Sequence, residues 1–439
     1  MTFNFKSRLD RLEGSGPSGR ATPDAAQAVP LEVADGRRPR PDQFATRSTL
    51  EELREKMASI LEREPPPPRQ RTRELRIVEL PFTRVETADG PLHERLDRQS
   101  PSHHVGRMPL DAALATEARI LALLALDPGL AEIAPEGALF LDTETTGLGG
   151  GAGTLAFLVG LAWFEQGVLV VEQLLLRTPG EEVPLLLRVR ERIERASLLV
   201  TFNGKAFDLP LLHGRYVMNR VRRPPARPHL DLLHVARRLH RARIRSCTLK
   251  ALEAEVLGFV RDGDIDGADV AARYGHYLRT GDEAALVSVV QHNSWDVVSM
   301  AALVGLYGEP LGALHAEDLV GLARTYRRAR AFDEAERAAE CAVERGAGAE
   351  GLRVRGEIAK ARGDRGRALR DFELLVESVD EASVRLELAK LYEHFVRRPD
   401  QALDMLNRGT GERPEATERR RARLERKLRG SIGGRTSSR

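Results

Sequence analysis

Two carboxylates at the end of a short apolar run are the residues in this sequence whose types and spacing best suit chemistry. Asp142 and Glu144 follow residues 139–141 in the stretch A-L-F-L-D-T-E-T-T-G. Such a run predicts a short buried strand, in which residues i and i+2 share a face about 6.6 Å apart. Two like charges there repel each other and lose hydration, so a cation would compensate them, and carboxylate oxygens suit Mg²⁺ or Mn²⁺. The alternative is a pair of solvated acids at a strand end.

Three further residues, Asp208, His292 and Asp296, lie on predicted elements that could bring them next to this acid pair. Asp208 ends the motif N-G-K-A-F-D, which follows a predicted buried strand over residues 198–202 and opens the next helix. An acid at a helix N-terminus is commonly a cap, and it also suits a third metal ligand. His292 and Asp296 are spaced i and i+4, so they share a face if their segment is helical. The histidine could then take a proton from water while the aspartate holds a metal, or the two could form a buried hydrogen-bonded pair.

A glycine-rich stretch directly after the first two acids raises a different possibility. Residues 147–154, G-L-G-G-G-A-G-T, match the dinucleotide-binding pattern G-x-G-x-x-A. That fingerprint requires a helix immediately after the glycines, whereas residues 155–164 are apolar, contain aromatic side chains and are interrupted by Gly160. They predict a second strand, and residues 168–176 predict a third. We therefore favour a glycine-rich hairpin within three consecutive antiparallel strands over a dinucleotide site.

The most basic part of the chain lies between residues 220 and 245. It contains nine arginines, at positions 220, 222, 223, 227, 237, 238, 241, 243 and 245. This run indicates either a surface that follows phosphates or an ordinary solvated face. Within it, Asp231 stands at a predicted junction between a strand and a helix, where capping is its expected role and a secondary catalytic role is the alternative. The acidic turn R-D-G-D-I-D-G at residues 261–267 lacks the spacing of a calcium loop and is expected to be a plain loop.

Three motifs carry the acids described above: D-x-E at Asp142 and Glu144, N-x-x-x-F-D ending at Asp208, and H-x-x-x-D from His292 to Asp296. In this order they resemble the three exonuclease motifs of the DEDD (DnaQ-like) superfamily, whose members have an RNase H-like fold. Several stretches between residues 139 and 306 more closely resemble the bacterial ribonuclease H-like proteins of the YprB type. The resemblance implies a mixed sheet flanked by helices and two divalent ions, Mg²⁺ or Mn²⁺, bound by Asp142, Glu144, Asp208 and Asp296. One motif departs from the pattern. It has the spacing of the tyrosine-bearing branch of the superfamily but carries His292 where that branch has tyrosine.

The expected function follows from these residues and from the resemblance together. Two metal ions about 4 Å apart can activate water and stabilise the leaving 3′ oxygen of a phosphodiester. We expect a two-metal-dependent 3′–5′ exonuclease acting on DNA or RNA, with His292 as general base. The alternatives are a non-catalytic scaffold for nucleic acid or protein, and a structure-specific endonuclease. Contacts to nucleic acid are expected from Thr145, Asn203, Lys205, Phe207 and Arg237. For the rings of Phe207 and Trp295, core packing is favoured over stacking on a base.

The composition excludes several classes of protein. The 439 residues include 68 lysines and arginines against 65 acidic residues, and only seven of the basic residues are lysines. This arginine bias is compatible with phosphate binding or with genome composition alone. Cys247 and Cys341 provide no disulfide framework and no C-x-x-C metal site, and no apolar run reaches about 18 residues. We therefore expect a soluble cytoplasmic protein without a membrane span or signal peptide.

Composition also divides the chain into segments. Residues 1–74 are rich in Pro, Gly and Arg and predict a flexible leader with one short amphipathic helix, near residues 49–61. Residues 75–137 predict an arm of short extended segments followed by a helix over residues 112–126. Residues 138–308 contain the motifs described above and form the expected nuclease domain.

A helical repeat is expected at the end of the chain. Ala335, Ala368 and Ala402 are 33 and 34 residues apart, and each opens the second helix of a predicted pair. This period resembles tetratricopeptide repeats, which predicts an all-α domain over residues 309–430 and a disordered tail over residues 431–439. Repeats of this kind bind proteins or act as scaffolds, so a protein partner is expected.

Overall fold

The structure, a computed structural model, describes residues 79–100, 102–147 and 153–433. The short helix expected in the leader and most of the glycine-rich stretch at residues 147–154 lie outside the described residues. Within them, no helix is both long enough and apolar enough to cross a lipid bilayer.

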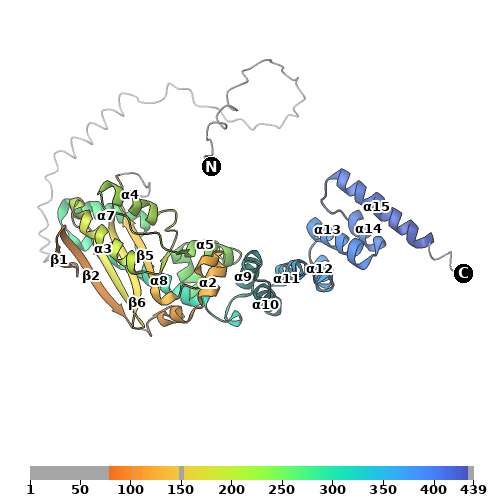
Figure 1. The fold of residues 1–439 in the computed structure, drawn as a ribbon, viewed down its shortest axis with the longest axis horizontal. Coiled ribbons are helices and arrows are strands. Elements are labelled where there is room, and N and C mark those ends of the chain that lie inside the picture. The colour runs from red at the N-terminus through yellow and green to blue at the C-terminus, as the bar shows by residue number, and fades with distance from the viewer. Residues whose placement is uncertain (1–78, 101, 148–152, 434–439) are drawn as a thin grey trace, which may run out of the picture. The chain divides into compact units, whose positions relative to one another are not determined.

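A seven-stranded mixed sheet is the framework of the N-terminal half of the described chain (Figure 1). Its strand order is β1 (Thr83–Thr87), β2 (Gly90–Gln99), β7 (Val168–Leu175), β6 (Ala156–Glu165), β5 (Ala138–Thr145), β8 (Leu198–Thr201) and β9 (His229–Asp231). Strands β5, β6 and β7 pair antiparallel, whereas β8 and β9 run parallel to β5. The predicted mixed sheet and its three consecutive antiparallel strands are therefore confirmed, and a strand follows the glycines where a dinucleotide site would need a helix.

Helices cover both faces of this sheet because side chains of its strands alternate between two apolar cores. Along β5, Ala138 and Phe140 belong to one core, and Leu139 and Leu141 belong to the other. The first core is closed by α2 (Ala118–Ala125), α5 (Leu232–Leu239) and most of α8 (Val287–Tyr307). The second core is closed by α3 (Glu182–Arg195), α4 (Asp208–Met218) and α7 (Gly267–Thr280).

The segment before β5 is more closely joined to the sheet than an arm would be. Strands β1 and β2 form a hairpin, and β2 also pairs antiparallel with β7, so the hairpin forms one edge of the sheet. The single helix expected over residues 112–126 is wrong. A 3₁₀ helix over Leu110–Ala115 and α2 are separated at Thr116, which is extended. The Thr116 hydroxyl donates to the carbonyl of Val304 in α8 at 3.0 Å, which holds the break against the core.

The C-terminal region is helical, as predicted. It contains α9 (Ala316–Arg328), α10 (Phe332–Glu344), α11 (Gly348–Arg362), α12 (Arg365–Ser378), α13 (Ala382–Leu391), α14 (Pro399–Asn407) and α15 (Pro414–Gly433). Helix α9 packs on α5. The Arg243 guanidinium, in the loop after α5, donates to Asp318 of α9 at 2.8 Å. The last extends to Gly433, three residues into the segment that the sequence predicts to be disordered.

Candidate active site

The acid pair lies in the middle of the sheet because β5 is flanked by β6 on one side and by β8 on the other. Asp142 and Glu144 point to the face that α8 covers, where the Asn293 amide donates to Asp142 Oδ2 at 2.9 Å. Thr143 points the other way, and its hydroxyl donates to Asp208 Oδ1 at 2.6 Å. Asp208 is the first residue of α4 and follows the N-cap position, Phe207. The strand therefore fixes two acids directly and a third through the intervening threonine.

Gly160 explains how α8 comes so close to the sheet. It is paired with Asp142 across β5 and β6, and a Cβ placed on it would lie only 2.4 Å from the Asn293 side-chain oxygen. That oxygen accepts a hydrogen bond from the Gln173 amide at 3.0 Å, while the Asn293 nitrogen donates to Asp142. The glycine that interrupts the apolar strand thus makes room for the amide that orients Asp142.

A Gly160→Ala substitution is expected to displace Asn293 and release Asp142. Because the contact lies in a packed interior, we expect a loss of about 1–3 kcal/mol in the free energy of unfolding. We also expect at least a tenfold loss of any activity that depends on Asp142, measured at a temperature where the variant remains folded. Gly214→Ala is the control, since a Cβ there meets no atom within 4 Å. Equal activity of the two variants would contradict this role of Gly160.

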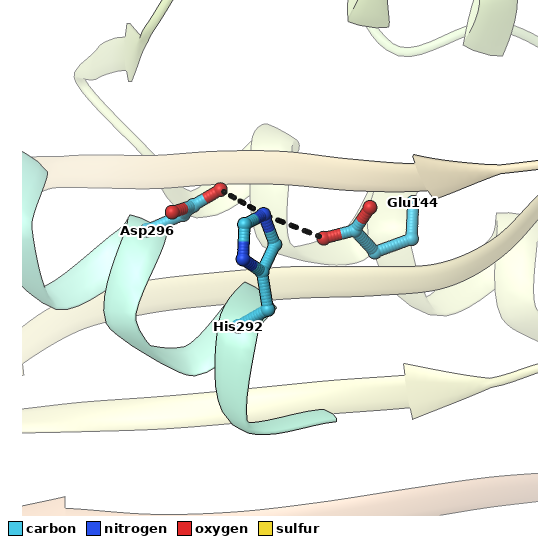
Figure 2. A group of neighbouring side chains, drawn as sticks. All are labelled: Glu144, His292 and Asp296. Carbon is cyan, nitrogen blue, oxygen red and sulfur yellow. Dashed lines mark ion pairs between the residues drawn. The ribbon is translucent and has the colours of Figure 1, made fainter. Parts of the chain in front are cut away.

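Helix α8 presents the last two predicted site residues to the sheet. Figure 2 shows Glu144 of β5 and Asp296 of α8 on either side of His292. The His292 Nε2 atom lies 3.9 Å from Glu144 Oε1 and 3.6 Å from Asp296 Oδ2. One ligand atom from each residue falls within 4.8 Å of the others. The i and i+4 spacing read from the sequence therefore places both α8 residues on the face that meets the acid pair.

Burial raises the pKa of three of the four carboxyl groups, and repulsion within the cluster adds to the shift of Asp142 and Glu144. Burial, followed by the charge of Asp296, raises the pKa of Glu144 to about 8. Burial also raises the pKa of Asp208, to about 6, against the hydrogen bond from Thr143. The pKa of Asp142 is raised well above its ordinary value by burial and then by the charges of Asp296, Glu144 and Asp208. These groups are close enough to oppose each other's ionisation.

This donor set fits a divalent cation. The Glu144 Oε1 atom is buried and accepts no hydrogen bond from any described residue, although a buried oxygen normally has a partner. A bound cation would provide that partner and would offset the repulsion that raises these pKa values. Carboxylates and one imidazole are ligands that Mg²⁺ and Mn²⁺ accept.

A second layer of charged residues supports α8 from the loop and helical turn that precede α7. The Arg261 guanidinium donates to both Glu253 oxygens, at 2.6 and 2.7 Å, and also to Asp296 Oδ1. Glu253 is fully buried, and the Arg261 side chain is 1% exposed. No sequence pattern indicated a role for either residue, although Arg261 does lie in the loop that the sequence predicts. The signal available was a lone arginine in an acidic turn.

Asp264, in the same loop, orients the His292 ring. Its Oδ1 atom lies 2.7 Å from His292 Nδ1, and its side chain is 2% exposed. Burial alone would raise the pKa of Asp264, but the hydrogen bond from His292 and the nearby positive charges lower it overall. An ionised carboxylate can only accept, so this contact, shorter than the 3.2 Å between Nδ1 and the Arg261 guanidinium, favours a hydrogen on Nδ1, and Nε2 faces Glu144 and Asp296.

The pKa of His292 is itself raised. Burial on its own would lower it, but the carboxylates of Asp296, Glu144 and Asp264 outweigh that effect. His292 therefore has one nitrogen fixed by a carboxylate and the other facing the acid cluster. That is the arrangement of a group that can exchange a proton there.

A cavity of about 590 Å³ opens beside these groups. Asp142, Glu144 and Asp208 line it, and so do three of the residues expected to contact nucleic acid: Thr145, Asn203 and Phe207. The expected core packing of Phe207 is wrong, because its side chain is 56% exposed. Trp295 is half-buried and packs against Arg261, whose guanidinium lies 5.5 Å from the ring.

The other two residues expected to contact nucleic acid, Lys205 and Arg237, are exposed and do not line this cavity. The basic run that contains Arg237 divides into two groups. Arg238 donates to the carbonyl of Leu124 and Arg243 pairs with Asp318, so these side chains hold the fold together. Arg222 and Arg223 are exposed and form no ion pair with any described residue.

Asp231 acts as a cap, as predicted. Its Oδ1 atom accepts from the backbone of Leu233, in the first turn of α5, at 3.1 Å. It also accepts from the backbone N–H of Asn203 at 2.8 Å and, through Oδ2, from that of Lys205 at 3.1 Å. One carboxylate thus ties the start of α5 to the loop that leads into Asp208, which explains how Asn203 is held at a φ of +67°.

Asp231→Ala is expected to lower the free energy of unfolding by about 2–4 kcal/mol, because it leaves three backbone donors without their acceptor. Urea unfolding measures the change. Asp266→Ala is the matched control, since Asp266 caps α7 through one exposed bond, to Ala268, and its loss should remove only about 1 kcal/mol. Equal effects of the two substitutions would show that the hydrogen bonds to Asn203 and Lys205 add nothing to the free energy of unfolding.

The segment that carries the site is similar in sequence to known proteins. Residues 139–307 match a family model described as the RNase H superfamily. The chain is also 42% identical over 166 residues to the uncharacterized protein YprB of Bacillus subtilis, an alignment that covers 37% of this chain and 40% of that protein. The matched part spans less than half of the relative's length. The segment that contains the whole acid cluster, its histidine and their supporting loop is therefore similar to an RNase H superfamily domain.

Proposed function

We propose that this protein is a two-metal-dependent nuclease that removes nucleotides from the 3′ ends of single-stranded DNA or RNA. The observation that carries the proposal is the convergence of four carboxylates and one oriented histidine, with three of the carboxylates lining one cavity. Similarity to the RNase H superfamily supports nuclease chemistry. The 3′–5′ direction rests on the resemblance of the motifs to the DEDD exonucleases.

The proposed roles follow from where each side chain lies. Asp142, Glu144, Asp208 and Asp296 would hold Mg²⁺ or Mn²⁺. When bound, such ions lower the pKa of water and stabilise charge on the phosphate and on the leaving oxygen. His292 Nε2 would accept the proton of the attacking water, while Asp264 holds the opposite nitrogen. Thr145 and the exposed ring of Phe207 would contact the terminal nucleotide, the ring by stacking on its base.

The direct test is digestion of a single-stranded oligonucleotide labelled at its 5′ end. With Mg²⁺ or Mn²⁺ we expect a ladder of products that shorten stepwise from the 3′ end, and we expect no cleavage of a circular single strand. Cleavage of the circle would favour an endonuclease. Asp142→Ala should be inactive under all conditions, which excludes a contaminating nuclease. If the wild type cuts neither substrate with either metal, the proposal fails and the non-catalytic scaffold is favoured.

We further propose that the C-terminal helices form tetratricopeptide-like repeats that bind a protein partner. Ala335, Ala368 and Ala402 recur at this period, and all three are fully buried near the starts of α10, α12 and α14. Small buried residues at equivalent positions let paired helices approach closely, which supports the repeat assignment.

A further inference from the structure

A second cavity, of about 550 Å³, lies against α4 and has a basic lining. Arg222, Arg223, Arg227 and His213 contribute its polar side chains, and Leu199 and Leu209 contribute to an apolar floor. No acidic residue lines it. Burial lowers the pKa of His213, and the charge of the nearby Arg223 lowers it further.

This basic cavity and the carboxylate cavity lie on different sides of the same helix. Leu209 and His213 of α4 line the basic cavity, whereas Pro210 and Leu211 line the carboxylate cavity. Since successive residues of a helix are about 100° apart, these pairs face different directions from the first two turns. Asp208 starts the helix that separates them.

The arginines of the basic cavity differ in the contacts that their side chains make. Arg227 donates to the carbonyls of Ile193 and Glu194 near the C-terminal end of α3, so it is part of the fold. Arg222 and Arg223 are exposed and form no ion pair with the described residues. Two guanidinium groups at the rim of an apolar hollow are thus available to an anionic ligand.

We propose that this cavity binds backbone phosphates of the nucleic-acid strand whose end enters the carboxylate cavity. The inference rests on the proposed function, because it takes that strand to be the substrate. An α-helix with its side chains is about 10–12 Å wide. Stacked nucleotides advance about 3.4 Å each, so a strand that crosses α4 needs three or four nucleotides between the two cavities. Arg222 and Arg223 would therefore act on longer strands and not on the shortest ones.

The test is binding of fluorescent single strands of 12 and of 3 nucleotides to the full chain in EDTA, at 50–200 mM NaCl. For Arg222→Ala/Arg223→Ala we expect affinity for the 12-mer to fall about tenfold at 50 mM salt. The slope of log affinity against log salt should become less negative by about 1.4, or about 0.7 for each phosphate that the protein no longer neutralises. Affinity for the 3-mer should not change. Arg419→Ala/Arg426→Ala removes the same charge from exposed positions on α15 and should change neither affinity.

Several outcomes would overturn the assignment. Equal binding of the 12-mer by the wild type and the Arg222/Arg223 variant would do so, as would an equal loss in the Arg419/Arg426 control or a wild type that binds no strand. If inorganic phosphate or a mononucleotide competes as well as the 12-mer, the cavity takes small phosphate compounds and not a strand. The outcome is separable from nuclease activity. A protein that binds as expected but never cleaves would retain this site and lose the proposed function.

Discussion

Glu144→Gln is expected to lower the rate of hydrolysis by at least about a thousandfold and, at the same time, to stabilise the metal-free protein above pH 8. The loss of activity follows because glutamine keeps the shape of the side chain but offers no charge to a cation or to the transition state. The gain in stability follows because the glutamate is buried beside three other acids and its Oε1 has no hydrogen-bond donor among the described residues.

The direction of the pH effect follows from the pKa. Glu144 has a pKa of about 8 in the folded protein, against 4.5 for an ordinary glutamate. The folded state therefore binds more protons than the unfolded state between these values, and its stability falls as pH rises from about 4.5 to about 8. Above pH 8 the full penalty applies, on the order of a few kcal/mol. Glutamine does not titrate, so the variant should lose less stability over this range.

Urea unfolding in EDTA at pH 5, 7 and 9, together with the digestion assay, measures both effects. Glu172→Gln is the matched control, because Glu172 is fully buried but accepts from Arg188 and Arg192 at 2.6–2.9 Å. Neutralising it removes the carboxylate that pairs with the half-buried Arg192, while Arg188 keeps its ion pair with Glu94, and should destabilise the protein at every pH. A Glu144→Gln variant that is less stable than the wild type at pH 9 would show that no electrostatic strain is stored at the acid cluster.

Sequence patterns could predict those parts of the site that depend on local geometry. The apolar run before Asp142 predicts a strand that carries both acids near its end, the acid of N-G-K-A-F-D begins a helix, and His292 and Asp296 share a helical face. In each case, periodicity or the junction between two elements determines where the side chain points. The order of the motifs along the chain then indicated that they could meet.

Contacts between distant segments could not be predicted in the same way. Gly160 makes room for Asn293, which lies 133 residues later, and no local pattern in either segment reveals that fit. Asp264 and Arg261 belong to a turn that resembles a solvated acidic loop until α8 is placed against it. Phe207 has a large apolar side chain of the kind found in protein cores, yet the loop that Asp231 holds directs its ring outward. Burial of each group depends on packing that only the tertiary structure determines.

His292→Gln is expected to reduce kcat by about a hundredfold to a thousandfold, because the substitution removes the group that would accept a proton from water. Asp264→Asn should act in the same direction but less, by about tenfold, since the amide can no longer fix the ring through an ionised acceptor. Both variants should keep Asp296 in place, because Arg261 continues to hold it.

A double-mutant cycle tests whether Asp264 works through the histidine. If Asp264 only positions that ring, the His292→Gln/Asp264→Asn double variant should be no slower than His292→Gln alone. Additive losses would assign Asp264 an independent role.

The concentration of Mn²⁺ that gives half-maximal activity should be measured for each variant, because Glu144, His292 and Asp296 also lie close enough together to share a metal ion. A general base leaves that concentration nearly unchanged when it is removed, whereas the loss of a ligand raises it, so a large increase in His292→Gln would replace the proton-transfer role with coordination.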